Sequence, residues 1–297
     1  MGTNVFEKGS YLVESLSVKS SESKPILIVT PTEEGEYPVL LFFHGFLITD
    51  SAYSKLLHLI SSHGYILVAP QLSTSIFTSG NEEVKSAAGI TNWLVSSLGT
   101  ILSSNNFKSV PNLNKVALAG HSRGGRNAFA LALGYGGSLT LKFSVLIGID
   151  PVAGLSKCLQ MEPKILTYNP KSFNIGIPVA VLGTGLGIES KCCGLMPACA
   201  PEGVNHDEFF DECKPPRWHF LVKDFGHMDM LDDSSKKLSS CICKSNGGDW
   251  EPFRKCLAGI LVAIMRACLD DVKEDIQVIV NNPSVSPTPI DVQYEEE

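Results

Sequence analysis

The residues best suited to chemistry surround Ser122, in the segment Gly120-His-Ser-Arg-Gly-Gly125. The apolar run 115–119 precedes this segment and predicts a strand, and the run 126–133 predicts a helix after it. A serine in a Gly-x-Ser-x-Gly turn between a strand and a helix is typical of a hydrolase nucleophile. We expect glycine to be required on both sides, because a Cβ there would crowd the strand and the helix. The hydroxyl would then lie at a helix N-terminus, where negative charge is favoured.

A serine nucleophile needs a base to take its proton and an acid to orient that base. In a strand–turn–helix hydrolase the chain order is serine, acid, histidine, and these groups follow the C-terminal ends of strands. His227 comes after Ser122 and directly follows the predicted strand 218–222, so we predict that it is the base. The alternatives are His219, which lies inside that strand, and His206, which lies in a cysteine-rich segment.

The position of the acid is less restricted. Asp150 ends the buried strand predicted over 143–149, and Glu189 follows the next predicted strand, 178–182. Because parallel strands end at the same edge of a sheet, position alone makes the two carboxylates nearly equal candidates. The further alternatives are Asp207 and Asp229.

An oxyanion hole requires two backbone donors close to the serine. One is expected from Arg123, which follows the nucleophile. The second is expected from Phe46, in the loop His44-Gly45-Phe46 that ends the predicted strand 37–43. His121, next to the serine, is expected to pack or hydrogen-bond near the site and not to act as the base.

Alternating strands and helices predict an α/β fold, with a mainly parallel central sheet covered by helices on both faces. The further predicted elements are strands over 11–18, 26–30 and 64–69 and helices over 50–62, 84–102 and 252–269. We expect one domain over residues 1–270, with a cysteine-rich insertion at about 188–217. Proline and repeated acids over 281–297 predict a disordered acidic tail.

Composition narrows the function classes. The formal net charge of −7 argues against a nucleic-acid partner, since there is no basic stripe to neutralise phosphates. The longest apolar runs are far shorter than the roughly 20 residues of a membrane-spanning helix, so we expect peripheral membrane contact at most. The N-terminal residues show neither a signal peptide nor an arginine-rich transit peptide, which leaves the cytoplasm and the chloroplast as expected compartments.

All nine cysteines lie between Cys158 and Cys268. An odd count without a secretion signal favours reduced thiols. The cysteines lack paired Cys-x2-Cys spacing and no matching histidine pair is visible, so we expect neither a metal nor a cofactor. One or two disulfides are the alternative; they would fasten the insertion near the site, and reduction would then lower activity. The cysteines considered are Cys192, Cys193, Cys199, Cys213, Cys241 and Cys243.

Several segments together resemble the plant chlorophyllases, and the resemblance covers roughly residues 10–270. They are the serine segment already quoted, Pro38-Val-Leu-Leu-Phe-Phe-His-Gly45, Ile149-Asp-Pro-Val152, Gly203-Val-Asn-His206 and Phe225-Gly-His-Met-Asp-Met-Leu-Asp-Asp233. The resemblance implies an α/β-hydrolase fold and a cofactor-free serine esterase that cleaves chlorophyll to chlorophyllide and phytol. It also implies a triad of Ser122, Asp150 and His227, and so favours Asp150 over Glu189.

The chain resembles the type with little N-terminal extension, whereas some members carry a longer one that is taken to be a plastid address. A twenty-carbon alcohol as leaving group implies a broad, apolar pocket. Two other functions are compatible with the same residues. One is a carboxylesterase or lipase for other lipophilic esters, because the triad determines the reaction and the pocket determines the substrate. The other is a non-catalytic binding protein on the same scaffold.

Overall fold

The computed structural model describes residues 4–19, 24–73, 75, 77–191 and 197–296. Its strands are β1 (Val13–Lys19), β2 (Pro25–Pro31), β3 (Gly35–Phe43), β4 (Ile66–Pro70), β5 (Ser109–His121), β6 (Val145–Ile149), β7 (Val179–Thr184), β8 (Arg217–Val222) and β9 (Ile290–Glu295). Its α-helices are α1 (Ser54–Ser61), α2 (Gly80–Ser104), α3 (Arg123–Ala132), α4 (His206–Glu212), α5 (Lys236–Ile242), α6 (Glu251–Leu269) and α7 (Glu274–Asn281). Short 3-10 helices cover Asp50–Tyr53, Asp233–Ser235 and Pro283–Val285.

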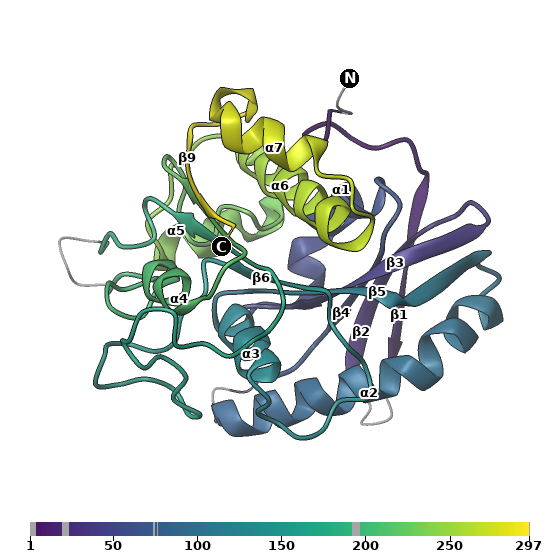
Figure 1. Ribbon diagram of the computed structural model, residues 1–297, viewed down its shortest axis with the longest axis horizontal. Helices are drawn as coiled ribbons and strands as arrows, with labels where there is room; N and C mark the ends of the chain where they lie inside the picture. Colours follow the sequence, from purple (N-terminus) through teal and green to yellow (C-terminus); the bar gives the residue numbers. More distant parts are fainter. Residues whose placement is uncertain (1–3, 20–23, 74, 76, 192–196, 297) are drawn as a thin grey trace.

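The nine strands form one sheet in the order β1-β2-β4-β3-β5-β6-β7-β8-β9 (Figure 1). The strands from β4 to β8 in this order are parallel to one another, and antiparallel strands complete both edges. The predicted α/β class with a mainly parallel sheet is therefore confirmed. All parallel strands end at the edge where Ser122 follows β5.

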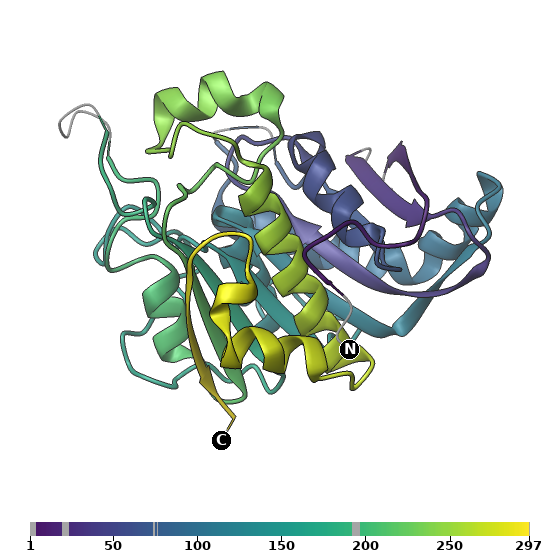
Figure 2. The ribbon, with the colours of Figure 1, turned by 90° about the horizontal axis from the view of Figure 1, so that it is seen from above.

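Two hydrophobic layers cover the sheet, because alternate side chains of each strand point to opposite faces. In β3, Leu40 and Phe42 pack into one layer with α1, α6 and α7, whereas Leu41 and Phe43 pack into the other with α2, α3 and α4. Figure 1 shows the two helical layers on opposite sides of the sheet, and Figure 2 looks onto α6 and α7. Burial on both faces explains why the central strands read as continuous apolar runs and not as alternating ones.

The predicted disordered tail is wrong for residues 290–295, which form β9. This strand pairs antiparallel with β8, from Val222 opposite Ile290 to Arg217 opposite Glu295. The Tyr294 ring stacks on Trp218 with a centroid distance of 5.2 Å, and the Glu295 carboxylate lies 2.6 Å from the Arg217 guanidinium. The open edge of β8 supplies hydrogen-bond partners for the backbone of β9. Acidic residues of this strand form ion pairs with basic residues, so their charges do not keep the segment apart from the fold. Composition alone misses both effects.

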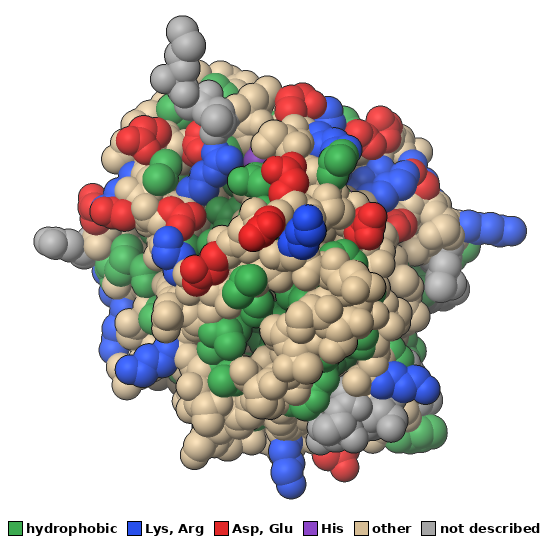
Figure 3. Space-filling model, turned by 90° about the vertical axis from the view of Figure 1, so that its right-hand side faces the viewer, with side chains coloured by type: hydrophobic (Ala, Val, Ile, Leu, Met, Phe, Trp, Pro, Cys, Tyr) green, Lys and Arg blue, Asp and Glu red, His purple; other side chains and the backbone are tan. Residues whose placement is uncertain are grey.

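The face where β3 and β5 begin lies opposite the edge that carries Ser122. Figure 3 shows this face, on which side chains of both charge signs are interspersed around a small group of hydrophobic ones. None of the helices in the part of the chain that the structure describes is long and apolar enough to span a bilayer.

Candidate active site

Ser122 occupies a strained turn between β5 and α3, with φ 57° and ψ −125°. A Cβ at Gly120 would lie 2.3 Å from the carbonyl oxygen of Gly124, and a Cβ at Gly124 would lie 2.4 Å from that of His44. The expected need for glycine at both positions is confirmed. The turn holds the serine side chain away from the sheet and leaves the residue 8% exposed. Local strain of this kind is common where a side chain must be presented for reaction.

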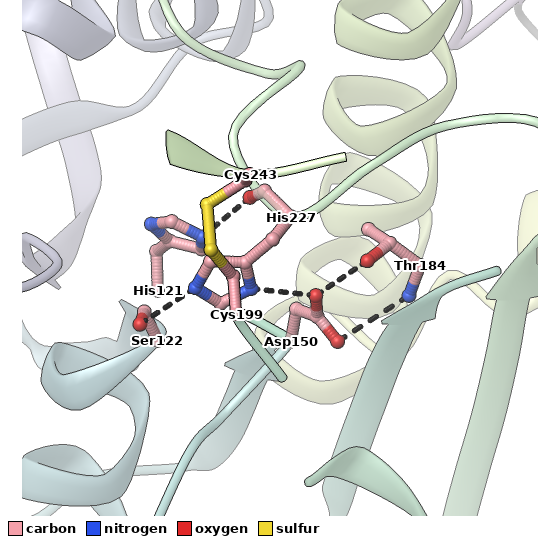
Figure 4. The surroundings of a disulfide bond; sticks show 7 residues. All are labelled: His121, Ser122, Asp150, Thr184, Cys199, His227 and Cys243. Atoms are coloured by element: carbon pink, nitrogen blue, oxygen red, sulfur yellow. Dashed lines mark hydrogen bonds and ion pairs between the residues drawn. A yellow bond between two sulfur atoms is a disulfide. The ribbon is translucent and has the colours of Figure 1, made fainter. Parts of the chain in front are cut away.

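The structure brings Ser122, His227 and Asp150 together from three strand ends. The serine Oγ lies 2.8 Å from His227 Nε2, and His227 Nδ1 lies 2.7 Å from Asp150 Oδ2 (Figure 4). With the proton on Nδ1, the imidazole donates to the carboxylate and its Nε2 accepts the serine hydroxyl. This arrangement allows the histidine to take a proton from the serine.

Asp150 is completely buried and has a positive φ of 43°. Its carboxylate also accepts hydrogen bonds from the hydroxyl and the backbone N–H of Thr184. Burial raises the pKa of this carboxyl, but the hydrogen bond and charge of His227, together with His206 and Thr184, outweigh it and leave the pKa lowered. The group at the base of the site is thus a carboxylate at neutral pH.

Thr184 and Gly187 lie against the Asp150 carboxylate, and the sequence analysis did not single them out. A Cβ at Gly187 would lie 2.6 Å from the Thr184 hydroxyl oxygen and 3.0 Å from the Asp150 carboxylate, so a side chain there would displace both. The available signal was the run Gly183-Thr-Gly-Leu-Gly187 directly after a predicted strand.

The alternative acids contact other partners. The Glu189 side chain is 47% exposed and lies 3.4 Å from Lys244. Asp229 is buried, but its carboxylate accepts the backbone N–H groups of Gly226 and Asn246 and so closes the loop around the base. Asp207 lies beside His206 and His219, on the other side of β7 from Asp150. Of the four carboxylates, the structure places Asp150 against His227.

The loop that follows β3 lies directly against the nucleophile. A Cβ at Gly45 would lie 3.3 Å from the Ser122 Cβ. Arg123 is the first residue of α3, and the N–H groups of a first helical turn have no partner within the helix. The backbone of Phe46 follows Gly45, so both expected oxyanion donors come from segments next to the serine.

His44 orients the peptide that carries the Phe46 N–H. Its Nδ1 donates to the carbonyl oxygen of Gly45 over 2.7 Å, and its Nε2 accepts the N–H of Leu72 over 2.9 Å. The Gly45 carbonyl and the Phe46 N–H belong to one planar trans peptide and point in opposite directions. Burial lowers the pKa of His44, which keeps the ring neutral and able to accept from Leu72. Sequence reasoning treated His44 only as a strand end.

Comparison with known proteins identifies the family. The family model Chlorophyllase matches residues 1–297. Chlorophyllase-1 of Arabidopsis thaliana is 45% identical over 299 residues, covering 96% of this chain and 90% of the relative. Chlorophyllase-2 of the same plant is 44% identical, and the match covers 93% of this chain and 92% of the relative. Chlorophyllase-1, chloroplastic, of Citrus unshiu is 43% identical, and the match covers 98% of this chain and 88% of the relative.

The chain belongs to the chlorophyllase family. The resemblance in the sequence is thereby confirmed, and with it the class of enzyme, because the named chlorophyllases are carboxylic ester hydrolases.

A buried relay in this chlorophyllase family member connects the loop after β3 with the loop of the base. The Gly45 N–H donates to the Tyr53 hydroxyl over 2.9 Å, and this hydroxyl donates to His121 Nδ1 over 2.7 Å. His121 Nε2 then donates to the carbonyl oxygen of His227 over 2.8 Å. Burial lowers the pKa of His121 to about 3, so it stays neutral and fixes two loops without titrating near pH 7.

The Arg123 side chain lies at the open mouth of the site. Its Nε lies 2.6 Å from the Glu83 carboxylate, and its guanidinium stacks over the Phe46 ring with a distance of 4.9 Å to the ring centre. Because Phe46 is 44% exposed, its ring faces solvent at the pocket beside the serine. The residues that line this pocket include His44, Gly45, Phe46, Leu47, Leu72, Ser73, Ser75 and Arg123.

A disulfide joins Cys199 to Cys243 and lies beside His121 and His227 (Figure 4). The expectation of reduced thiols is wrong for this pair, and the alternative of a disulfide that fastens the insertion near the site is right. The segment after Cys243 packs tightly on the base loop, since a Cβ at Gly226 would lie 1.9 Å from the carbonyl oxygen of Lys244. Spacing along the chain gave no sign that residues 44 positions apart would meet.

The other described cysteines carry free thiols. Cys158 and Cys241 are exposed, Cys213 and Cys256 are buried, and Cys268 is half-buried. Cys192 and Cys193 lie outside the described residues. Cys199 and Cys243 were among the cysteines considered as zinc ligands, and as a disulfide they have no thiolate to offer a metal.

Proposed function

We propose that this protein hydrolyses the phytyl ester of chlorophyll to chlorophyllide and phytol. In this proposal Ser122 is the nucleophile, His227 the base and Asp150 the acid that orients it. The observation that carries the proposal is the continuous chain of contacts from the serine through the imidazole to the carboxylate, at 2.8 Å and 2.7 Å. Membership of the chlorophyllase family supports the choice of ester.

The reaction would begin when the Ser122 oxygen attacks the ester carbonyl while His227 Nε2 takes the hydroxyl proton. The carbonyl oxygen becomes negatively charged and would accept hydrogen bonds from the backbone N–H groups of Phe46 and Arg123. His227 then returns its proton to the phytol oxygen as the carbon–oxygen bond breaks, which leaves an acyl-enzyme. Water attacks this acyl group in a second round, with His227 again as base, and releases chlorophyllide.

Asp150 would stabilise the imidazolium that forms twice in this cycle. A carboxylate in a buried position interacts strongly with a charge formed beside it, because little water screens the pair. The Thr184 hydroxyl keeps one carboxylate oxygen hydrogen-bonded, so the acid need not reorient during the reaction. The positioning residues His44 and His121 would hold the oxyanion loop and the base loop respectively.

The mouth of the site favours a lipophilic substrate. Phe46 is 44% and Leu47 50% exposed at the pocket next to the serine, and Phe77, one residue before the Thr78 carbonyl that accepts from Arg123, is 88% exposed. Exposed apolar side chains of this kind lower the cost of receiving an isoprenoid alcohol. They also suit transient contact with a lipid or pigment-bearing surface, which is the only membrane contact we propose.

The direct test is hydrolysis of purified chlorophyll by the wild type, Ser122→Ala and the exposed-serine control Ser51→Ala, beside a short-chain aryl ester. Ser122→Ala should lower the rate on both substrates by about 10⁴-fold or more, and Ser51→Ala should match the wild type. Cleavage of the short ester alone would retain the serine esterase and overturn chlorophyll as substrate. A folded wild type that cleaves neither substrate would overturn both and favour a binding protein.

The compartment is tested separately. Cell fractionation with an antibody against this protein distinguishes the chloroplast from the cytoplasm, the two locations that we propose. Recovery in a secretory fraction would contradict both.

A further inference from the structure

A second group of histidines lies behind the proposed active site. His206 begins α4, Asp207 follows it, and His219 lies in the middle of β8. His206 Nδ1 is 2.9 Å from His219 Nε2, and Asp207 Oδ1 is 3.2 Å and 3.8 Å from these two nitrogens. Three atoms that can each offer a lone pair thus converge on one point.

A positive centre between the three atoms would interact favourably with all of them at once. A proton on His206 Nδ1 can be donated toward His219 Nε2 and Asp207 Oδ1, at 2.9 Å and 3.2 Å. His219 Nε2 and Asp207 Oδ1, which are 3.8 Å apart, then share no hydrogen bond. A point equidistant from the three atoms lies about 2 Å from each, which is the usual length of zinc bonds to imidazole nitrogen and carboxylate oxygen. One metal ion can therefore contact all three with ordinary bond lengths.

The two imidazoles are held rigidly before any ligand arrives. Their side chains are 4% and 6% exposed, and the rings stack on each other with centroids 5.0 Å apart. The Phe210 ring stacks on the His219 ring, and the centroids of these two rings are also 5.0 Å apart. A capping box between Asn205 and Glu208 fixes the start of α4 and hence the position of His206. Preorganised ligands lose little conformational entropy when they bind.

Solvent reaches the cluster through Asp207, whose side chain is 67% exposed. The adjoining surface pocket is acidic: four carboxylates and one lysine line it with Tyr168. Its residues are Lys157, Tyr168, Asp207, Glu208, Asp211 and Glu212. A concave surface with an excess of negative charge raises the local concentration of cations, so cations are drawn to the open side of the cluster.

We propose that His206, His219 and Asp207 bind one zinc ion, with water as the fourth ligand. Two nitrogens and one oxygen suit zinc better than magnesium or calcium, which prefer oxygen ligands. The ion would join α4 to β8. The cluster is also close to the triad: a Cβ at Gly183 would lie 2.4 Å from the His206 ring, and the next residue, Thr184, donates to Asp150. The proposal replaces the expectation of no metal, which rested on cysteine spacing and on the lack of a visible histidine pair.

The test is zinc titration of metal-stripped full-length protein whose accessible thiols have been alkylated, followed by isothermal calorimetry. The wild type should bind one equivalent. Asp207→Asn should weaken binding at least tenfold, because it removes a charged ligand at an exposed position. Asp211→Asn is the matched control: it removes the same charge from the same pocket, is not a ligand, and should stay within twofold of the wild type.

Two further measurements separate this site from other zinc binding. His219→Gln should abolish the one-equivalent phase, with circular dichroism to verify the fold. Cobalt bound to the wild type should give visible bands of nitrogen and oxygen ligation without thiolate charge transfer. The proposal is overturned if the wild type binds no zinc, if all three variants bind alike (an adventitious ion only), or if cobalt shows thiolate ligation.

Discussion

Two groups of histidine and carboxylate lie on either side of β7, and they differ in which member is buried. In the first, Asp150 is completely buried and faces His227, whose other nitrogen meets the Ser122 hydroxyl. In the second, the histidines are buried and the carboxylate of Asp207 is exposed. The first group has the serine hydroxyl beside its imidazole, as proton transfer requires, whereas the second has no hydroxyl among its contacting atoms and is the site proposed for a zinc ion. The acid that is buried is thus the one proposed to orient the base, and the acid that is exposed is the one proposed as a metal ligand.

The electrostatics of the two groups differ in the same way. Burial raises the pKa of Asp150, but the hydrogen bond and charge of His227 and the other partners of Asp150 reverse this, so the group that faces His227 is a carboxylate. In the second group, burial lowers the pKa of His219 to about 4, whereas Asp207 and the neighbouring acids raise the pKa of His206. The two pKa values move in opposite directions because imidazoles this close repel each other when both are charged.

Asp150→Asn should have the largest effect on the first group. Asparagine has an NH2 donor in place of one carboxylate oxygen. An NH2 that faces Nδ1 donates to it, so the imidazole carries its proton on Nε2 and can no longer accept the serine proton. We expect kcat on a short aryl ester to fall about 10⁴-fold with KM nearly unchanged. A loss of less than tenfold, in a protein whose fold is intact by circular dichroism, would show that Asp150 does not orient the base.

Breaking the Cys199–Cys243 disulfide tests whether the segment packed on the His227 loop needs its covalent link. Cys243→Ser should lower the free energy of unfolding by about 2–4 kcal/mol in urea titrations, and activity should fall because the base loop packs on this segment. Cys241→Ser removes an exposed free thiol two positions away and is the matched control. Equal stability of the two variants would contradict the role given to the disulfide.

His121 offers a test by pH, because its pKa is about 3 in the folded protein and near 6.5 when exposed. A lowered pKa means that the unfolded chain binds the extra proton first, so this contribution to stability is fully present above pH 6.5. It is lost as pH falls toward 3, at about 1.4 kcal/mol per pH unit. His121→Gln should therefore reduce the slope of unfolding free energy against pH in this window, and the half-buried control His58→Gln should retain it.

The sequence predicted the strands up to β8, the helices α1, α2, α3 and α6, and the turn that carries Ser122, because these follow from local patterns. Gly120 and Gly124 indicate a turn in which a Cβ at either position would collide with the backbone. The continuous apolar runs indicate strands that are buried on both faces. The choice between Asp150 and Glu189 was different. Topology brings both to one sheet edge, but the direction of a carboxylate depends on a positive φ and on the partner Thr184, neither of which a pattern shows.

Tertiary pairing accounts for the remaining differences. His206 and His219 meet because α4 packs on the face of β8 that carries His219, and α4 has only seven residues, too few for a clear periodic signal. The strand β9 forms because β8 has an open edge, not because its own residues strongly favour a strand. In both cases the structure of a segment depends on the element that packs against it, and the sequence of the segment alone does not indicate it.

Glu189→Gln should have the smallest effect of all, and it sharpens the comparison of the strand ends. Glu189 has the position of a catalytic acid but is paired with Lys244 at the surface, where an ion pair contributes at most about 1 kcal/mol. We expect kcat and KM on the short ester within about twofold of the wild type, since a lost surface pair does not alter the triad. A loss approaching that of Asp150→Asn would mean that the acid changes identity during turnover, with the loop after β7 swinging onto His227. The two variants measured side by side therefore decide whether burial, and not position in the fold, makes a carboxylate catalytic.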